Sequence, residues 1–178
     1  TYLEASSDRH PLVLVGDLLF TQRQFADELS IAEQLKARAN LKSGMTVPEE
    51  LLNFLVQKPE NDAEAVRVGD TGIANRAARS VLSNCLTVLT GGPGTGKTYV
   101  LARCLALMLS AKENELDDVS VALIAPTGKA AARAKEMLNG LVIELRDQKE
   151  GNIAVSEKVL DALSRIEPRT IQRALGSK

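Results

Sequence analysis

The sequence predicts an α/β fold with an incomplete parallel sheet, preceded by a small and mostly helical N-terminal region. Two short runs, 86–90 and 119–125, are rich in apolar and β-branched residues, as is typical of strands that are covered on both faces. A helical pattern over 97–111 separates these runs. A strand, a helix and a second strand in this order indicate a parallel βαβ unit.

Composition places the chain among globular proteins and excludes several other classes. Of its 178 residues, 44% are hydrophobic and 25% are charged, which is enough to bury a core. The net charge of −1 gives no support to a basic nucleic-acid-binding tail or to a polybasic membrane anchor. No apolar run is long enough to span a membrane, and no signal peptide opens the chain. Two cysteines suggest a reducing compartment, so we expect a cytoplasmic protein.

Residues 1–70 are predicted to form the mostly helical N-terminal domain. A strand is expected over 11–17, ending in a turn at Gly16-Asp17. Capping-box patterns at 21–24 and 46–49 then predict the starts of two helices. The polar stretch 58–70, with its proline and glycine, indicates a connection.

Residues 71–178 are predicted to form the first part of the α/β domain. Besides the βαβ unit, the spacing of apolar residues predicts a short helix around 73–81 and another over 129–141. The second of these is expected to bury Ala130, Ala134, Met137, Leu138 and Leu141. Ser156 is expected to cap a further helix, and 169–175 to be helical again. Because a sheet of this kind usually has more strands, we expect the sequence to be a fragment.

A glycine-rich segment after the first predicted strand carries the clearest chemistry. Gly91-Gly-Pro-Gly-Thr-Gly-Lys-Thr98 fits the phosphate-binding loop G-x-x-x-x-G-K-[ST]. Its glycines let successive N–H groups point at phosphate oxygens, and the following helix directs its positive end there. Lys97 is expected to reach the β- and γ-phosphates of ATP, and Thr98 to bind Mg²⁺. A glycine-rich turn without a ligand is disfavoured, because a strand precedes the motif and a helix follows it.

A second segment follows the second predicted strand. In Ala125-Pro-Thr-Gly-Lys-Ala-Ala-Ala-Arg-Ala-Lys135, Thr127 lies at the carboxyl end of that strand, where α/β sheets place ligands. A helix start with a hydroxyl and Lys129 suits a nucleic-acid phosphate. For Arg133 and Lys135, a solvated helix face is the favoured interpretation.

These two segments together resemble motifs I and Ia of superfamily 1 helicases, in the wording of the RecD family, the alpha subunit of exodeoxyribonuclease V. The segment Arg169-Thr-Ile-Gln-Arg-Ala-Leu-Gly176 resembles the next block of that family, and the residues from Pro11 to Arg23 resemble the segment that opens its helical N-terminal region. The resemblance extends to both ends of the chain, although its strength depends on residues 86–135.

The resemblance implies a RecA-like motor domain and assigns roles to individual residues. It implies that the segment from Gly91 to Tyr99 (Gly91, Gly92, Pro93, Gly94, Thr95, Gly96, Lys97, Thr98, Tyr99) holds ATP and Mg²⁺, with Lys97 and Thr98 as the catalytic pair. It also implies that Thr127 and Lys129, and less strongly Thr170, contact single-stranded DNA. Two departures from the family affect these roles. The glutamine that reads adenine has only Asn75 and Arg76 as candidates here, and the histidine of the third block is Gln172.

The resemblance also implies the activity and the partners. It indicates a subunit of an ATP-dependent helicase in double-strand break repair, moving 5′ to 3′ and assembled with the beta and gamma subunits of exodeoxyribonuclease V (RecB-like and RecC-like). The N-terminal region is then expected to dock on a partner subunit. No Asp-Glu motif follows a strand in this sequence, so we expect these residues to bind nucleotide but to be inactive alone.

Three alternatives remain. One is a stand-alone RecD-like or relaxase-type helicase, for which a longer N-terminal extension would be the sign. Another is a P-loop ATPase without motor function, such as a switch or clamp loader, against which the Ala-Pro-Thr-Gly-Lys segment argues. A purely structural scaffold conflicts with the intact pair of Lys97 and Thr98.

Overall fold

The computed structural model describes residues 11–56, 71–148 and 154–176. The N-terminal part contains β1 (Leu12–Val15), β2 (Leu18–Thr21), α1 (Gln22–Ala39) and α2 (Glu49–Val56). The middle contains α3 (Thr71–Ser83), α4 (Lys97–Ala111) and the 3-10 helix η2 (Glu113–Asp118). The last part contains β3 (Ile124–Ala125), α5 (Gly128–Asp147), α6 (Glu157–Arg165), β4 (Arg169–Thr170) and α7 (Ile171–Ala174). The connection predicted over 58–70 lies outside the described residues.

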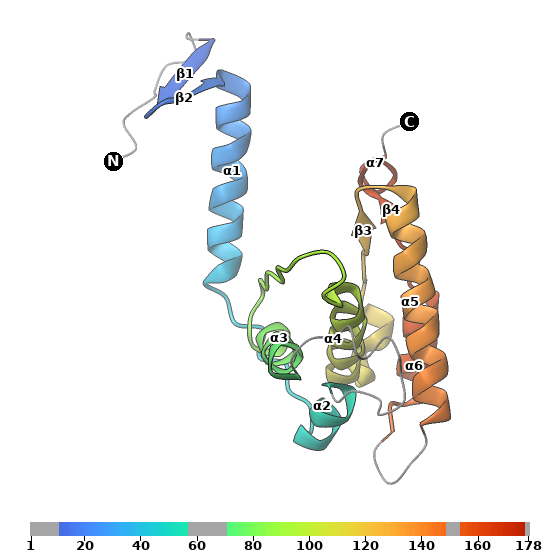
Figure 1. Cartoon of the computed structure of the whole chain (residues 1–178). Coiled ribbons are helices and arrows are strands. Elements are labelled where there is room, and N and C mark those ends of the chain that lie inside the picture. Colours follow the sequence, from blue (N-terminus) through green and yellow to red (C-terminus); the bar gives the residue numbers. More distant parts are fainter. Residues whose placement is uncertain (1–10, 57–70, 149–153, 177–178) are drawn as a thin grey trace.

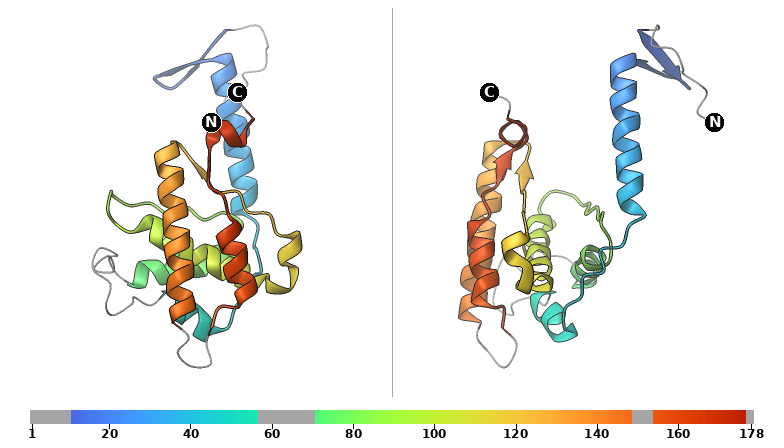
Figure 2. Two further views of the ribbon diagram at one scale, coloured as in Figure 1. Left: turned by 90° about the vertical axis from the view of Figure 1, so that its right-hand side faces the viewer. Right: turned by 180° about the vertical axis from the view of Figure 1, so that it is seen from behind.

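The chain begins with a β-hairpin that continues into a long helix. The predicted first strand is half of this hairpin, because β1 pairs antiparallel with β2, and Gly16 (φ 59°) supplies the turn. The predicted capping box is confirmed: the Gln24 N–H donates to the Thr21 hydroxyl at 3.2 Å, and the Thr21 N–H donates to the Gln24 side chain at 3.3 Å. Among the named elements, α1 contacts only the hairpin. Both therefore stand apart from the other helices (Figures 1 and 2).

The core lies among helices α2 to α6. Helix α4 is at its centre and packs against α2, α3, α5 and α6, as the views in Figure 2 show. The largest fully buried side chains are Leu55, Leu107, Leu138, Val159, Leu160 and Leu163. Since Leu55 belongs to α2, the end of the N-terminal part shares this core with the helices that follow it. No helix in the described part of the chain has the length and apolar character needed to cross a membrane.

The parallel sheet is smaller than predicted. Its only strands among the described residues are β3 and β4, which pair in parallel with Ile124 opposite Arg169 and Ala125 opposite Thr170. The run 86–90 is an irregular connection, so the strand predicted there is wrong in this structure, and of the run 119–125 only β3 is a strand. A strand needs a neighbour for its backbone groups, and the described residues provide none for 86–90.

The C-terminal helices follow the prediction with two corrections. Ser156 caps α6, accepting from the Val159 N–H at 3.3 Å. Helix α5 continues to Asp147 instead of ending near residue 141 and also buries Ala131, Val142 and Leu145, whereas Ala130 and Met137 are only half-buried. It packs against both α4 and α6, which requires a wider apolar face. The helix predicted over 169–175 is divided, because residues 169–170 pair with β3 before α7 begins.

Candidate functional site

The glycine-rich loop leads directly into the first turn of α4. Gly94 (φ 76°) and Gly96 (φ 74°) adopt left-handed backbone conformations, which glycine accepts without strain. Gly96 is also the N-cap of α4 and makes no side-chain cap hydrogen bond. The first N–H groups of α4 therefore have no capping side chain, and the positive end of the helix is available to an anion.

Lys97 folds back over this loop. Its ammonium group donates to the carbonyl oxygen of Gly91 at 2.7 Å and also to that of Gly92. The Thr95 hydroxyl donates to the Gly92 carbonyl at 2.9 Å, and a Cβ on Gly91 would lie only 2.8 Å from that hydroxyl oxygen. These hydrogen bonds hold the loop in a compact conformation against the ammonium group of Lys97, the lysine that the motif requires. This donor set, a lysine with glycine-supplied N–H groups at a helix start, fits a phosphate group.

A cavity of about 710 Å³ opens beside the loop. One wall consists of residues 94–99 and Ala102, and the other is a stripe along α5. The stripe consists of Arg133, Glu136, Met137, Gly140, Leu141 and Glu144. Arg133 is exposed, but it faces this cavity, so its interpretation as a merely solvated side chain is incomplete. The helical spacing from Arg133 to Glu144 is the signal that could have identified this wall.

The predicted DNA-contacting residues lie at the edge where β3 and β4 end. Thr127 caps α5 and accepts from the Ala130 N–H at 3.2 Å, and Lys129 is exposed in the first turn. Thr170, paired with Ala125, caps α7 in the same way, accepting from the Arg173 N–H at 3.3 Å. The structure thus brings the three residues to one edge, and none of them lines the cavity beside the glycine-rich loop.

Lys135 has a different environment from the predicted one. Its ammonium group donates to the carbonyl oxygens of Ser164 at 2.8 Å and Ile166 at 2.9 Å, and it pairs with Glu167 at 2.6 Å. Lys135 therefore closes the C-terminal end of α6, and the prediction of a solvated side chain is wrong. The residues that it binds are about thirty positions away in the sequence, at a helix end, where their free carbonyls need donors.

Asn75, a candidate for reading adenine, lies on α3 and does not line the cavity. Its side-chain oxygen accepts from the Nε of Arg79 at 2.8 Å, and Arg79 in turn pairs with Glu49. Arg76 is exposed and also lies outside the cavity wall.

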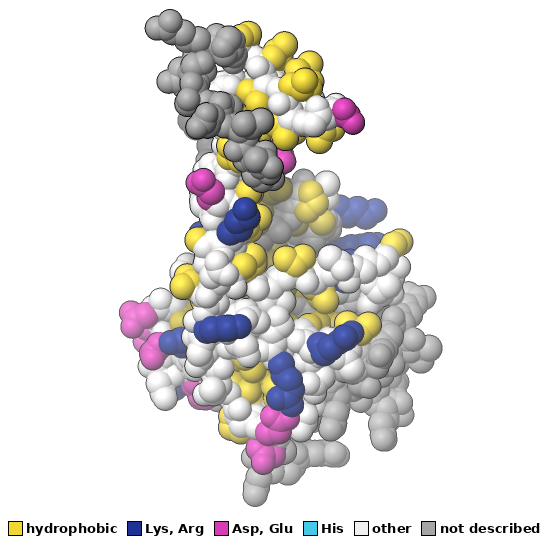
Figure 3. All heavy atoms as spheres, turned by 90° about the vertical axis from the view of Figure 1, so that its left-hand side faces the viewer, with side chains coloured by type: hydrophobic (Ala, Val, Ile, Leu, Met, Phe, Trp, Pro, Cys, Tyr) yellow, Lys and Arg dark blue, Asp and Glu magenta, His cyan; other side chains and the backbone are white. Residues whose placement is uncertain are grey.

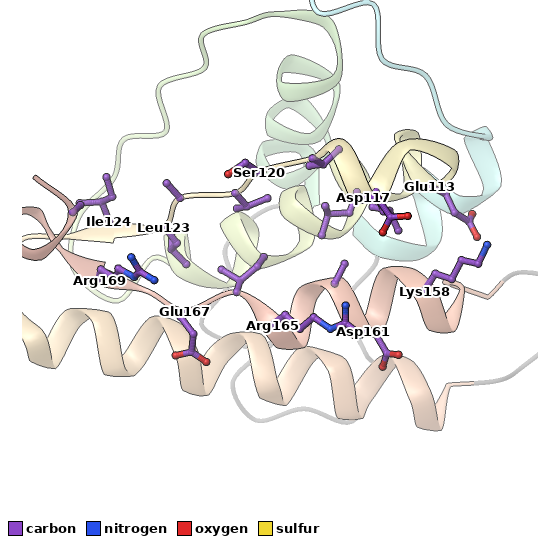
Figure 4. A pocket seen from close by; sticks show the side chains of 18 of the residues that line it. Glu113, Asp117, Ser120, Leu123, Ile124, Lys158, Asp161, Arg165, Glu167 and Arg169 are labelled. Atoms are coloured by element: carbon purple, nitrogen blue, oxygen red, sulfur yellow. The ribbon is translucent and has the colours of Figure 1, made fainter.

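A larger hollow of about 980 Å³ lies elsewhere, between the segment 113–124 and α6 (Figure 4). Charged side chains of both signs line it, among them Asp117, Lys158 and Arg165. None of the predicted site residues is part of its lining. Asp117 and Asp118 are exposed in η2, and the described residues contain no group of three or more His, Cys, Asp or Glu side chains that could hold a metal ion.

Comparisons with known proteins agree with the nucleotide-binding chemistry that the glycine-rich loop indicates. A family model described as an AAA domain matches residues 74–174. The RecBCD enzyme subunit RecD of Mycolicibacterium smegmatis is 39% identical over 130 residues, covering 70% of this chain and 20% of that protein. The subunit of the same name from Mycobacterium tuberculosis is 48% identical over 85 residues, covering 45% of this chain and 14% of that protein.

A third relative is more distant. The RecBCD enzyme subunit RecD of Buchnera aphidicola subsp. Schizaphis graminum is 31% identical over 131 residues, covering 72% of this chain and 19% of that protein. The chain thus spans about a fifth or less of the length of these relatives. The resemblance to the RecD family seen in the sequence is confirmed.

Proposed function

The chain belongs to the AAA domain family, and from this premise we propose that it carries the ATP-binding part of a DNA helicase subunit of RecBCD type. The observation that supports this most strongly is the closed loop at residues 91–96, with Lys97 inside it and the uncapped start of α4 behind it. The relatives are named as RecBCD subunits, which supports a role with RecB-like and RecC-like partners.

In this proposal, the residues of the loop bind the phosphates and a metal ion. ATP bound there would supply the phosphoanhydride bond to be hydrolysed, and Mg²⁺ would neutralise charge on its phosphates. The Lys97 ammonium group exchanges its carbonyl partners for phosphate oxygens and neutralises their charge. The N–H groups at the start of α4 orient the phosphates, and the Thr98 hydroxyl is the protein ligand of the magnesium ion.

Single-stranded DNA is proposed to cross the edge formed by Thr127, Lys129 and Thr170. Two helix starts meet there, those of α5 and α7, and hydroxyl groups at such positions suit backbone phosphates. Of the two helix starts, that of α5 is the stronger candidate, because α7 has only four residues. This arrangement supports contacts to the sugar-phosphate backbone and therefore binding without sequence preference.

The domain division is also a proposal. We infer that residues 1–70 act as an interaction region, and that 71–178 are the first part of a RecA-like domain with a larger parallel sheet. The hairpin supports the first inference, because Leu14, Leu18 and Leu19 are 64–70% exposed. Figure 3 shows hydrophobic side chains gathered at this end of the molecule, and exposed apolar patches are common at protein interfaces.

Nucleotide binding tests the proposal directly. A fluorescent ATP analogue with Mg²⁺ is titrated into the 178-residue chain, into Lys97→Ala and into Lys112→Ala. Lys112 follows the far end of α4 and pairs with Glu115, so it is a matched control. We expect Lys97→Ala to weaken binding by about tenfold or more, corresponding to about 1.4 kcal/mol or more. Equal affinities of all three proteins would contradict the proposal.

The DNA contact is tested with the same chain and a labelled single-stranded oligonucleotide. Lys129→Ala is expected to weaken binding and to reduce the dependence of affinity on salt concentration, because one phosphate contact is lost. Lys158→Ala, an exposed lysine of α6 beside the other hollow, is the control. If Lys158→Ala weakens binding and Lys129→Ala does not, the strand follows a different surface.

A further inference from the structure

Arg103 is the one charged residue that is buried in the described part of the chain, with 4% of its surface exposed. It lies on α4 and makes three contacts with different parts of the fold. One terminal nitrogen donates to the Leu55 carbonyl oxygen at 2.8 Å, and the other binds the Glu144 carboxylate at 2.5 Å. The guanidinium carbon lies 4.4 Å from the centroid of the Tyr99 ring. Arg103 thus joins α2, α4 and α5 at one point.

Two of the three helices that Arg103 joins, α4 and α5, begin at the two proposed ligand sites. Helix α4 begins at Lys97, and α5 begins directly after its N-cap Thr127. Tyr99 and Glu144, the side chains that contact the guanidinium group, also line the cavity beside the glycine-rich loop. The Glu144 carboxylate accepts a second hydrogen bond from Gln148 at 3.1 Å, which fixes its position. Glu144, one partner of the ion pair, is therefore part of the cavity wall, and it belongs to α5, the helix that begins at the proposed DNA edge.

A gain in stability does not by itself explain why a charged residue, Arg103, is buried in this core. A buried ion pair is commonly replaced by apolar side chains of similar size with little loss of stability, because desolvation offsets much of the attraction. In the described part of the chain, the Nε of Arg103 has no hydrogen-bond partner. What an arginine provides beyond apolar packing is direction, because its planar group donates hydrogen bonds only along fixed directions. Such a group sets the orientation of α4 relative to α5.

We propose that Arg103 is a positioning residue that couples the glycine-rich loop to the DNA edge, through its ion pair with Glu144. This inference rests on the proposed function. A nucleotide that moves Lys97 also moves Arg103, which is six residues further along the same helix, about 9 Å away. Glu144 transmits this displacement to α5, and α5 carries it to Thr127 and Lys129. By linkage, DNA bound at that edge changes the affinity for nucleotide by the same factor.

The test measures this coupling in the intact protein that contains the sequence. The dissociation constant of an ATP analogue is determined with and without a saturating single-stranded oligonucleotide, and the ratio of the two values is the coupling. Arg103→Met and Glu144→Gln each remove the ion pair. Arg146→Met is the matched control, because Arg146 also forms ion pairs from α5, with Glu157 and Asp161, but on the surface.

We expect a wild-type ratio of about 5 to 150, the usual range of such couplings, and a ratio near one for Arg103→Met and Glu144→Gln. The ratio is taken within each protein, so a change in the affinity of a variant for one ligand alone does not enter the comparison. If Arg103→Met fails to fold, Glu144→Gln, which keeps the shape of the side chain, carries the test.

Three results would overturn the inference while the proposed function stands. In the first, the wild type binds both ligands with a ratio of one. In the second, both ion-pair variants have a lower melting temperature and an unchanged ratio, which is a purely structural role. In the third, the control Arg146→Met lowers the coupling ratio as much as the two ion-pair variants do. A wild-type protein that binds no nucleotide contradicts the proposed function itself, and this inference with it.

Discussion

At the scale of single residues, the two cysteines have opposite environments. Cys85 is exposed, whereas Cys104 is buried on α4, and burial raises the pKa of the Cys104 thiol from 9.0 to about 11. Because only the thiolate reacts readily, a thiol reagent at neutral pH should label Cys85 and leave Cys104 unlabelled until the protein unfolds. Mass spectrometry of the labelled peptides measures this, and the Cys85→Ser variant should show almost no labelling before unfolding.

The same shift affects stability at high pH. A thiol whose pKa is raised in the folded state holds its proton more tightly there than in the unfolded chain. Its contribution to stability is complete below pH 9 and is lost as the pH rises through 9 towards 11. Cys104→Ala should therefore lose less stability than the wild type between pH 8 and about pH 11 in urea unfolding. An equal loss in both proteins would show that the thiol has the same pKa in the folded and the unfolded state, and would contradict the raised pKa.

The residues that could be predicted are those whose chemistry is local. Gly96 and Lys97 are adjacent in sequence and in the site, so a short motif was enough to identify them. Arg103 carries no such signal, because in the sequence it is one arginine within an apolar helix. Its partner Glu144 is 41 positions away, and only packing brings the two together. Lys135 was misassigned for the same reason.

At the scale of elements, Lys135 connects α5 to the end of α6. It donates to the carbonyl groups of Ser164 and Ile166 at the end of α6, and its side chain is 26% exposed. We expect Lys135→Met to destabilise the protein by about 1–3 kcal/mol, because hydrogen bonds to charged groups are lost while the apolar stem is kept. Lys129→Met, which changes an exposed lysine on the same helix, should change stability by less than about 0.5 kcal/mol. Urea unfolding midpoints compare the two, and equal effects would contradict this account.

Helices could be predicted more completely than strands. The starts of α1 and α6 are fixed by Thr21 and Ser156, whose hydroxyl groups bind backbone N–H groups three residues away, so the pattern is complete within a few positions. The run 86–90 has the composition of a strand, yet it forms none here, because a strand also depends on a neighbour. The neighbour that β3 does have, β4, is more than forty positions later in the chain.

At the scale of the whole molecule, the chain divides into a packed part and a part that stands free. Helix α4 has buried residues along most of its length, whereas α1 has none and contacts only the hairpin. Hydrophobic side chains in the free part, such as Ile31 (58% exposed) and Leu14 (70% exposed), are left without cover. The sequence predicted the helix correctly from its cap, but periodicity alone does not show whether an apolar face has something to pack against.

This division leads to a prediction about local stability. Amide hydrogens exchange through local opening where few buried contacts oppose it, and through global unfolding where many do. Most of the stability of a helix comes from packing its apolar face, and α1 has no buried residue. The amides of α1 should therefore exchange at least about tenfold faster than those of α4. Hydrogen-exchange mass spectrometry of the free chain measures both helices in one sample. Equal protection of α1 and α4 would mean that α1 folds against the core, and the exposed leucines of the hairpin would then no longer support a docking role.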